Sequence, residues 1–234
     1  MIDGHAFLGK SIYMKQSSSD LISKMDRLGL KATVVIAPPP GPFYEDANNL
    51  IREKANEFPD RLIPIFRANP HLEGESERVR IALTDQGFRG IQLDSKNDGY
   101  GVGDKIMNPI IQIANDLGVP VYIHSGDSIF CPIKAVADYA GSFEKVNFIT
   151  NFSQRAYKVA MKINNLYLMT RPFPTLMFKR GNTISLDIDR LIFTSDAPIG
   201  SLELELKRVD LSGLEQEAKD KIFGGNLRRL IEIQ

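Results

Sequence analysis

The sequence has a single cysteine, no tryptophan and no excess of charge of either sign. Cys131 has no second thiol to pair with, which excludes an internally disulfide-bonded secreted fold and favours a reducing, cytoplasmic location. The 29 basic and 29 acidic side chains cancel, so nothing electrostatic favours nucleic acid or an anionic membrane as a partner.

Long apolar runs and low-complexity segments are also absent. No apolar stretch approaches the roughly 20 residues needed to span a bilayer. The opening MIDGHAFLGK shows no basic leader before an apolar core, so we expect no secretory signal. No linker rich in Gly, Ser or Pro and no repeat divides the chain. The sequence thus predicts one domain over residues 1–234.

Short β-branched runs alternate with stretches of helical spacing along the whole chain. The predicted strands are residues 1–7, 31–37, 61–67, 90–93, 119–125, 146–150, 166–170 and 190–195. The predicted helices are residues 20–28, 45–58, 76–86, 104–117, 131–139, 154–163, 215–222 and 226–233. Strands separated by helices pair in parallel. Eight such units in 234 residues predict an α/β protein, a single (β/α)8 TIM barrel. An open doubly wound sheet is the alternative, but DGHAFLG lacks its glycine-rich phosphate turn.

Polar side chains stand at the carboxyl ends of several predicted strands, where such barrels carry their active sites. His5 ends the first strand, His124 ends the fifth, and Asp196 lies just past the eighth. Two imidazoles and a carboxylate form a ligand set for Zn²⁺, Fe²⁺ or Mn²⁺. A metal ion bound there would lower the pKa of its bound water towards ~7. We expect these three residues to converge on one pocket. The structural alternatives are hydrogen-bonded core histidines and a helix N-cap at Asp196.

Three further side chains are candidates for holding a substrate. Arg67 and Arg171 lie at the ends of the third and seventh strands, and Asn151 follows the sixth. Arginine binds carboxylates through two parallel hydrogen bonds, so these arginines predict a carboxylate-bearing substrate. Solvated loop arginines are the alternative for each. The glycine-containing loop at residues 94–104 has the composition of a lid over the barrel mouth or of a plain flexible loop.

Six segments resemble, in the right order, the amidohydrolase superfamily, and within it the amidohydrolase-related group of metal-dependent hydrolases and decarboxylases. They are IDGHAFLG (2–9), FRGIQLD (88–94), LGVPVYIHSGD (117–127), KVNFITNFS (145–153), RLIFTSDAP (190–198) and KIFGGNLRRLI (221–231). The resemblance implies a TIM barrel. It also implies that His5, His124 and Asp196 correspond to metal ligands of that group.

The same resemblance shows three departures at functional positions. Phe7 stands where the group has the second histidine of its His-x-His pair, and Asn151 stands where it has a sixth-strand histidine. Gln92 stands in place of the carbamylated lysine of binuclear relatives, which disfavours a binuclear site. We therefore expect at most one weakly bound divalent ion, with Zn²⁺ as the first choice, or none.

The expected function is hydrolysis or decarboxylation of a small carboxylate-bearing molecule. Asp196 and His124 would act as the acid–base pair, and Arg171, Arg67 and Asn151 would hold the substrate. Two alternatives remain open: a metal-free lactone or ester hydrolase, and a catalytically silent barrel with a binding or structural role. The expected partners are a small-molecule substrate and a second copy of the chain, since homodimers are the commonest oligomers.

Overall fold

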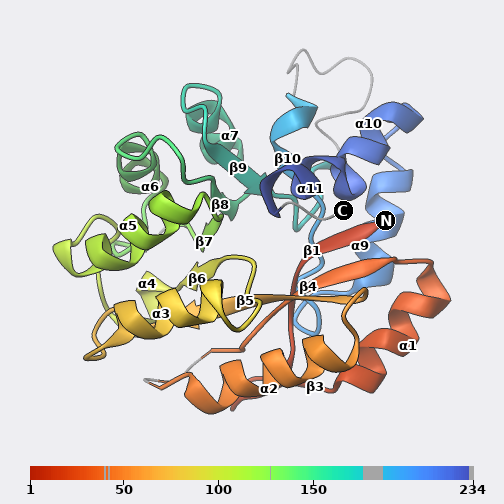
Figure 1. Cartoon of the computed structure of the whole chain (residues 1–234). Helices are drawn as coiled ribbons and strands as arrows, with labels where there is room; N and C mark the ends of the chain where they lie inside the picture. Colours follow the sequence, from red (N-terminus) through yellow and green to blue (C-terminus); the bar gives the residue numbers. More distant parts are fainter. Residues whose placement is uncertain (40, 42, 127, 176–186, 232–234) are drawn as a thin grey trace.

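Eight parallel strands form one sheet that curves into a barrel (Figure 1). The computed structural model describes residues 1–39, 41, 43–126, 128–175 and 187–231. In sheet order the strands are β1 (Ile2–Phe7), β4 (Ala32–Ile36), β5 (Leu62–Ala68), β6 (Ile91–Leu93), β7 (Val121–Ile123), β8 (Phe148–Asn151), β9 (Leu166–Met169) and β10 (Leu191–Ile192). The predicted (β/α)8 barrel is confirmed.

The first and last strands close the barrel through hydrogen bonds that follow β10 toward the mouth. The Gly4 N–H donates to the carbonyl of Phe193 at 2.8 Å, and the Phe7 N–H donates to that of Ala197 at 2.7 Å. A Cβ on Gly4 would lie 2.5 Å from a methyl carbon of Ile192, so glycine permits this close approach. The closure brings the end of β1 beside residues 195–197.

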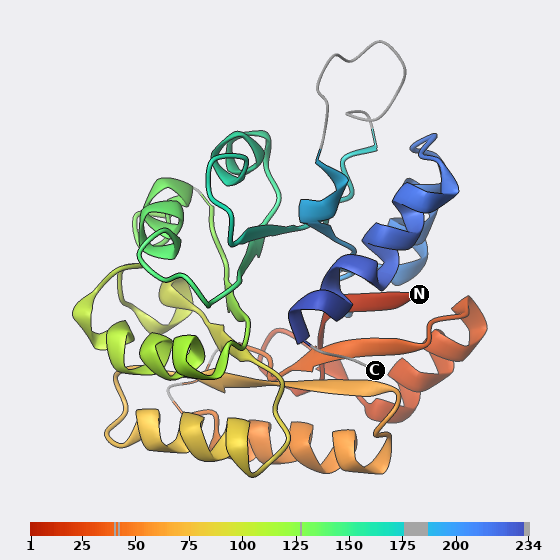
Figure 2. The ribbon, with the colours of Figure 1, turned by 45° about the horizontal axis from the view of Figure 1, so that its top comes forward.

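Helices surround the sheet on its outer side (Figure 2). They are α1 (Ser18–Leu28), α2 (Glu45–Glu57), α3 (Glu75–Thr84), α4 (Ser95–Asp98), α5 (Asn108–Leu117), α6 (Ile133–Ala140), α7 (Gln154–Ala160), α9 (Leu202–Asp210), α10 (Gln216–Asp220) and α11 (Asn226–Ile231). Short helical turns η1 (Lys105–Met107), η2 (Ile188–Arg190) and η3 (Lys221–Gly225), and a hairpin of β2 (Gly9–Lys10) and β3 (Lys15–Gln16), complete the described elements. None of the described helices is long and apolar enough to cross a membrane.

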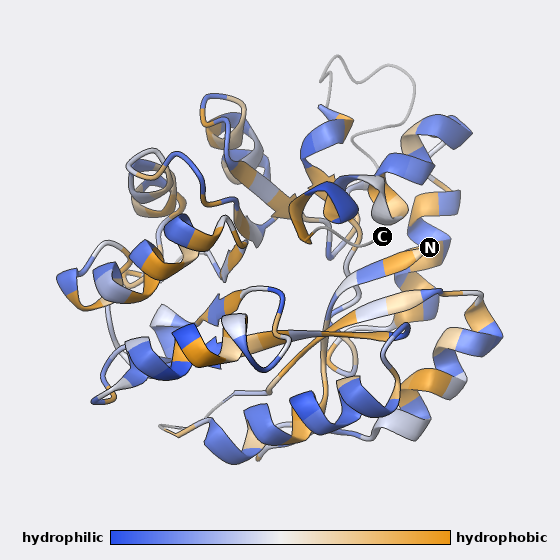
Figure 3. Ribbon diagram, in the orientation of Figure 1, coloured by the Kyte–Doolittle hydropathy of each residue, from blue (hydrophilic) through white to orange (hydrophobic). Residues whose placement is uncertain are grey.

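The apolar core has two parts, and strand residues of alternating direction contribute to both. Inside the barrel, residues such as Val34, Ile65 and Ile149 meet Leu227 and Leu230 of α11, which covers the barrel's amino-terminal end. A larger cluster fills the space between the sheet and the surrounding helices. Figure 3 shows apolar strands and amphipathic helices, as expected when each helix packs one face on the sheet and exposes the other to solvent.

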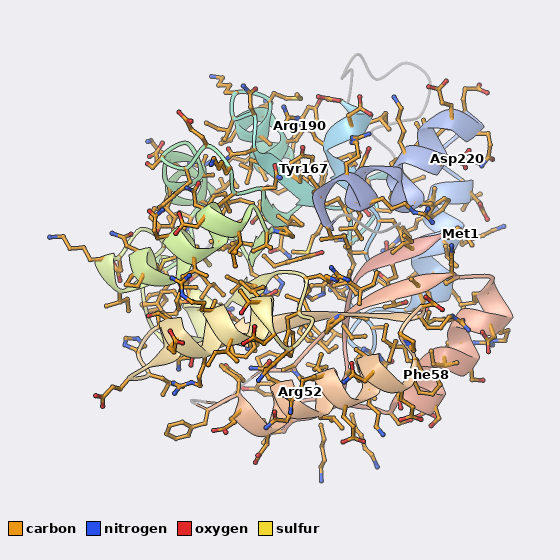
Figure 4. All side chains as sticks on the ribbon, viewed as in Figure 1. Met1, Arg52, Phe58, Tyr167, Arg190 and Asp220 are labelled. Atoms are coloured by element: carbon orange, nitrogen blue, oxygen red, sulfur yellow. The ribbon has the colours of Figure 1, made fainter. Side chains whose placement is uncertain are left out.

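A cationic side chain also contacts an aromatic ring near the amino-terminal end of the sheet. The Arg190 guanidinium of η2 lies over the ring of Tyr167 on β9, 5.4 Å from its centroid (Figure 4). Its hydrogen bond to the carbonyl of Asn164 holds it in that position. The contact ties η2 to the neighbouring strand at the start of β10.

Three segments differ from the expectations drawn from the sequence. The hairpin of β2 and β3 and helix α9 lie in stretches with no predicted element. The loop at 94–104 contains the helical turn α4, and Tyr100 within it is buried. Asp94 caps α4 by accepting a hydrogen bond from the Asn97 N–H, so the segment packs as part of the barrel mouth.

Candidate active site at the barrel mouth

His5 and Asp196 meet at the closure of the barrel. The Asp196 N–H donates to the His5 carbonyl at 2.9 Å, and imidazole Nδ1 and carboxylate Oδ1 are 2.8 Å apart. The second contact places the Asp196 carboxylate within ion-pair distance of the imidazole. Asp196 has φ +52°, a left-handed backbone that residues other than glycine seldom adopt. Such strain is typical of functional positions.

Asp3 holds this junction together and is a residue that the sequence reasoning left without a role. Its carboxylate is fully buried and accepts hydrogen bonds from the Ser195 N–H at 2.9 Å, from the Ser195 hydroxyl and from the His5 N–H at 3.2 Å. Burial raises the pKa of Asp3 to about 7, against the lowering effect of these hydrogen bonds. The available signal was the Ile-Asp-Gly-His motif, whose aspartate precedes His5 by two positions.

His124 completes a cluster with His5 and Asp196. It follows β7, and its ring centroid is 5.3 Å from that of His5. Its Nε2 is buried and has no hydrogen-bond partner among the described residues, and the same holds for His5 Nε2. Burial, with the neighbouring His5, lowers the pKa of His124 to about 4. His124 is therefore a neutral imidazole near pH 7, able to accept a proton or to bind an ion.

Arg171 supplies a positive charge to the same cluster. Its Nη1 is 3.3 Å from Asp196 Oδ2, and its backbone N–H donates to the Thr194 hydroxyl, also at 3.3 Å. Burial alone would raise the pKa of Asp196, but His5, His124 and Arg171 outweigh burial and hold that pKa below its ordinary value. Asp196 is thus a carboxylate at neutral pH. The Arg171 side chain is about one-third exposed, at 31%, so it can also reach a bound molecule.

Arg67, at the end of β5, is buried and paired with a carboxylate of the neighbouring strand, and its expected role in holding a substrate stays a prediction. Its side chain is fully buried, and its Nη2 donates to Asp94 Oδ2 at 2.5 Å. The Tyr44 ring covers the guanidinium, 4.6 Å from centroid to Cζ. Burial raises the pKa of Asp94, but the Arg67 charge outweighs burial and lowers it. Arg67 thus forms an ion pair with the buried carboxylate of Asp94. This ion pair positions Asp94 and the turn α4 that Asp94 caps.

Asn151 lies at the mouth between two cavities. Its Oδ1 accepts a hydrogen bond from the Ser125 N–H at 3.0 Å, which fixes the orientation of the amide. A pocket of about 300 Å³ lies beside it, lined by Asp94, Lys96, Asn97, His124, Ser125, Gly126, Ser128, Cys131 and Asn151. A larger cavity of about 880 Å³ adjoins Asn151 on the side of α6 and α7 and includes Arg155. A small molecule placed in the first pocket would contact His124.

The residues of the cluster do not fit a three-ligand metal centre as they are arranged. Among the described residues, no group of three His, Cys, Asp or Glu side chains is placed to hold an ion. The edge of the Phe7 ring packs against His5, with centroids 4.9 Å apart, where the second histidine of the pair would stand. Both Asp196 oxygens have cationic or imidazole neighbours already. A catalytic zinc requires three protein ligands and an open position, and this arrangement does not supply them.

Comparison with solved structures shows the same fold in several decarboxylases. The chain superposes on 5-carboxyvanillate decarboxylase from Sphingomonas paucimobilis with a TM-score of 0.80 at 11% identity, covering 100% of this chain and 99% of that one. For 2,6-dihydroxybenzoate decarboxylase from Rhizobium the TM-score is 0.76 at 15% identity, covering 99% and 98%.

A third similar structure contains a metal ion. It is dihydroxybenzoic acid decarboxylase from Polaromonas with bound manganese and the inhibitor 2-nitroresorcinol, with a TM-score of 0.76 at 14% identity, covering 99% of this chain and 96% of that one. Manganese is the ion in that structure, so the comparison gives no support to zinc as the first choice here. At these identities the likeness concerns the fold.

Sequence comparison identifies the family. Among curated proteins, none matches the sequence. The family model described as "Amidohydrolase" matches residues 23–168, which is more than half of the chain. The matched region contains Arg67 and His124 and forms part of the barrel. A TIM barrel is also the fold that the resemblance implied. The protein belongs to the amidohydrolase family.

Proposed function

We propose that this protein is a hydrolase or decarboxylase that acts on a small carboxylate-bearing molecule at the carboxyl-terminal mouth of its barrel. The observation that carries the proposal is the meeting of His5, His124 and Asp196 beside the 300 Å³ pocket. These three side chains come from distant parts of the sequence. Two buried imidazole nitrogens without partners among the described residues, and an aspartate with a strained backbone, are costly to maintain without a function.

His124 is the proposed proton acceptor. It is neutral near pH 7, lines the pocket, and its Nε2 has no partner among the described residues. In hydrolysis, this nitrogen would take a proton from the attacking water and return it to the leaving group. In decarboxylation, CO₂ leaves and its place on the carbon is taken by a proton, which the His124 imidazole would take up from solvent and deliver to that carbon. The Asp196 carboxylate would stabilise the imidazolium through its charge.

Arg171 and Asn151 are the proposed substrate-holding residues. Arg171 uses Nη1 for Asp196, which leaves other N–H groups of its partly exposed guanidinium for a substrate carboxylate. Asn151 uses Oδ1 for the Ser125 N–H, so its amide NH₂ is the group left for a substrate oxygen. The decarboxylases of similar fold act on aromatic carboxylates, which makes this chemical class the first to test.

The test is turnover of aromatic carboxylates and of carboxylate-bearing lactones and esters, with CO₂ release and acid release measured separately. We expect one of the two products with the wild-type chain. His124→Asn and Asp196→Asn should each lower kcat by about 10²–10⁴-fold, the usual contribution of a positioned acid–base group. Arg52→Met on the outer helix α2 is the control (Figure 4). Turnover unchanged in both mouth variants would contradict the proposal.

A further inference from the structure

The Arg171 side chain lies in a recess built for it. A Cβ on Gly200 would stand 2.5 Å from Arg171 Nε and 3.1 Å from its Cδ, so the glycine lets the arginine side chain pack directly against this turn. The same Cβ would lie 2.0 Å from the Ser195 carbonyl oxygen. The Gly200 N–H donates to the Asp196 carbonyl at 3.0 Å. The turn that presents Asp196 therefore also seats Arg171 against it.

Arg171 is fixed to this turn from two sides. Its backbone N–H contacts the Thr194 hydroxyl, and its Nη1 contacts the carboxylate of Asp196. Asp196 itself is only 8% exposed, so the charge of the guanidinium acts across a poorly hydrated contact and is weakly screened. The ion pair joins a largely buried carboxylate to a partly exposed guanidinium at the mouth.

A divalent ion at the cluster would compete directly with this guanidinium. With the guanidinium in place, the described side chains are not arranged to hold an ion. If the guanidinium were removed, the atoms that could turn to an ion are His5 Nε2, His124 Nε2 and Asp196 Oδ1, none of which has a hydrogen-bond partner among the described residues. An ion bound to Asp196 at about 2.0–2.2 Å would stand close to the Arg171 charge, because Arg171 is 3.3 Å from the same carboxylate. Two like charges at that separation repel strongly in a buried site.

We propose that Arg171 is the built-in counter-cation of Asp196 and that it keeps divalent ions out of the cluster of His5, His124 and Asp196. Asp196 receives from the guanidinium the positive charge that an ion would otherwise supply. The chemistry of the mouth then depends on protein side chains alone. Phe7 acts in the same direction, since it removes one possible ligand beside His5.

The test is titration of the full-length, chelator-treated chain with Mn²⁺, with free Mn²⁺ followed by electron paramagnetic resonance. We expect Arg171→Met to bind one Mn²⁺ at least tenfold more tightly than the wild type. Arg171→Lys, which keeps the charge, and Arg52→Met, which removes a charge far from the mouth, should bind as weakly as the wild type. Adding Asp196→Asn to Arg171→Met should abolish the gain, which assigns the ion to this cluster.

Three outcomes would overturn the proposal: stoichiometric tight binding by the wild type, no gain in Arg171→Met over Arg52→Met, or an equal gain in Arg171→Lys. Circular dichroism checks the fold of each variant, and Arg171→Gln replaces Arg171→Met if the latter does not fold. The readout is ion binding without substrate. A failure of the proposed hydrolase or decarboxylase activity is therefore recognised separately.

Discussion

At the scale of single residues, Phe7 is one of the three departures of this site from the ligand pattern that its sequence resembles. Phe7 is buried, and its ring packs edge-on to His5 at 4.9 Å. Both side chains lie on β1, two positions apart and thus on the same face of the strand. A histidine at position 7 would place a second imidazole next to the cluster.

We predict that Phe7→His binds Mn²⁺ or Zn²⁺ at least 10-fold more tightly than the wild type, since loss of even an outer partner of a ligand costs about 10–100-fold in affinity. Phe7→Leu is the matched control, because it changes the packing without adding a ligand. Isothermal titration with each ion measures the difference. Equal and tight binding by all three proteins would show that the existing three side chains suffice.

A second residue-scale effect concerns stability and pH. Asp98 accepts a hydrogen bond from the Tyr44 hydroxyl at 2.6 Å, and burial raises the pKa of Asp98 from 3.8 to about 6. The folded chain therefore binds this proton more readily than the unfolded chain between pH 4 and 6. The proton on Asp98 therefore stabilises the folded state below this interval. This part of the free energy of unfolding is lost as the pH rises from 4 to 6.

We predict that Asp98→Asn removes this part of the pH dependence. Asparagine keeps an acceptor for Tyr44 and carries no charge, so the variant should gain about 1–2 kcal/mol of unfolding free energy at pH 7.5, allowing for the partial exposure of Asp98. At pH 4 the two proteins should be nearly equal. Urea denaturation at both pH values measures this, and a gain that is the same at pH 4 and pH 7.5 would refute the titration of Asp98 as its cause.

At the scale of elements, helix α11 contributes to stability because it covers one end of the barrel. Leu227 is 1% exposed and belongs to the cluster inside the barrel, among residues from several strands. We predict that Leu227→Ala lowers the free energy of unfolding by about 2–4 kcal/mol, through lost burial and the cavity left behind. Leu211→Ala, at a side chain that is 60% exposed, should change it by less than about 0.5 kcal/mol. Chemical denaturation compares the two, and similar losses would refute the covering role.

Helix α9 shows why one element escaped prediction. Its sequence LELELKRVD alternates leucine and glutamate, which conceals the helical period. In the structure Leu202, Glu205 and Val209 are buried, and these positions share one face of a helix. Glu205 is buried because it accepts a hydrogen bond from the Phe173 N–H at 2.8 Å and pairs with Arg208. Phe173 lies 32 positions away along the chain, so this reason for burying Glu205 has no local signature.

At the scale of the whole molecule, the pattern of strands and helices was sufficient to predict the barrel. Parallel strands joined by helices have few ways to bury both faces, and eight of them close into one architecture. The same pattern placed His5, His124 and Asp196 at the carboxyl ends of strands, since all strands of a parallel barrel end at one face. The homodimer stays a prediction, and light scattering of the purified chain would test it.

What the sequence determined by itself was which side chains reach the mouth, because strand order and direction follow from local periodicity. Only the tertiary structure decided which charges pair there. Arg67 and Arg171 both lie at strand ends. Arg67 forms a buried ion pair with Asp94, whereas Arg171 pairs with Asp196 and stays partly exposed to solvent. The partners of each arginine lie 25 or more positions away along the chain. Pairing at such separations depends on barrel closure and on burial, which no local pattern encodes.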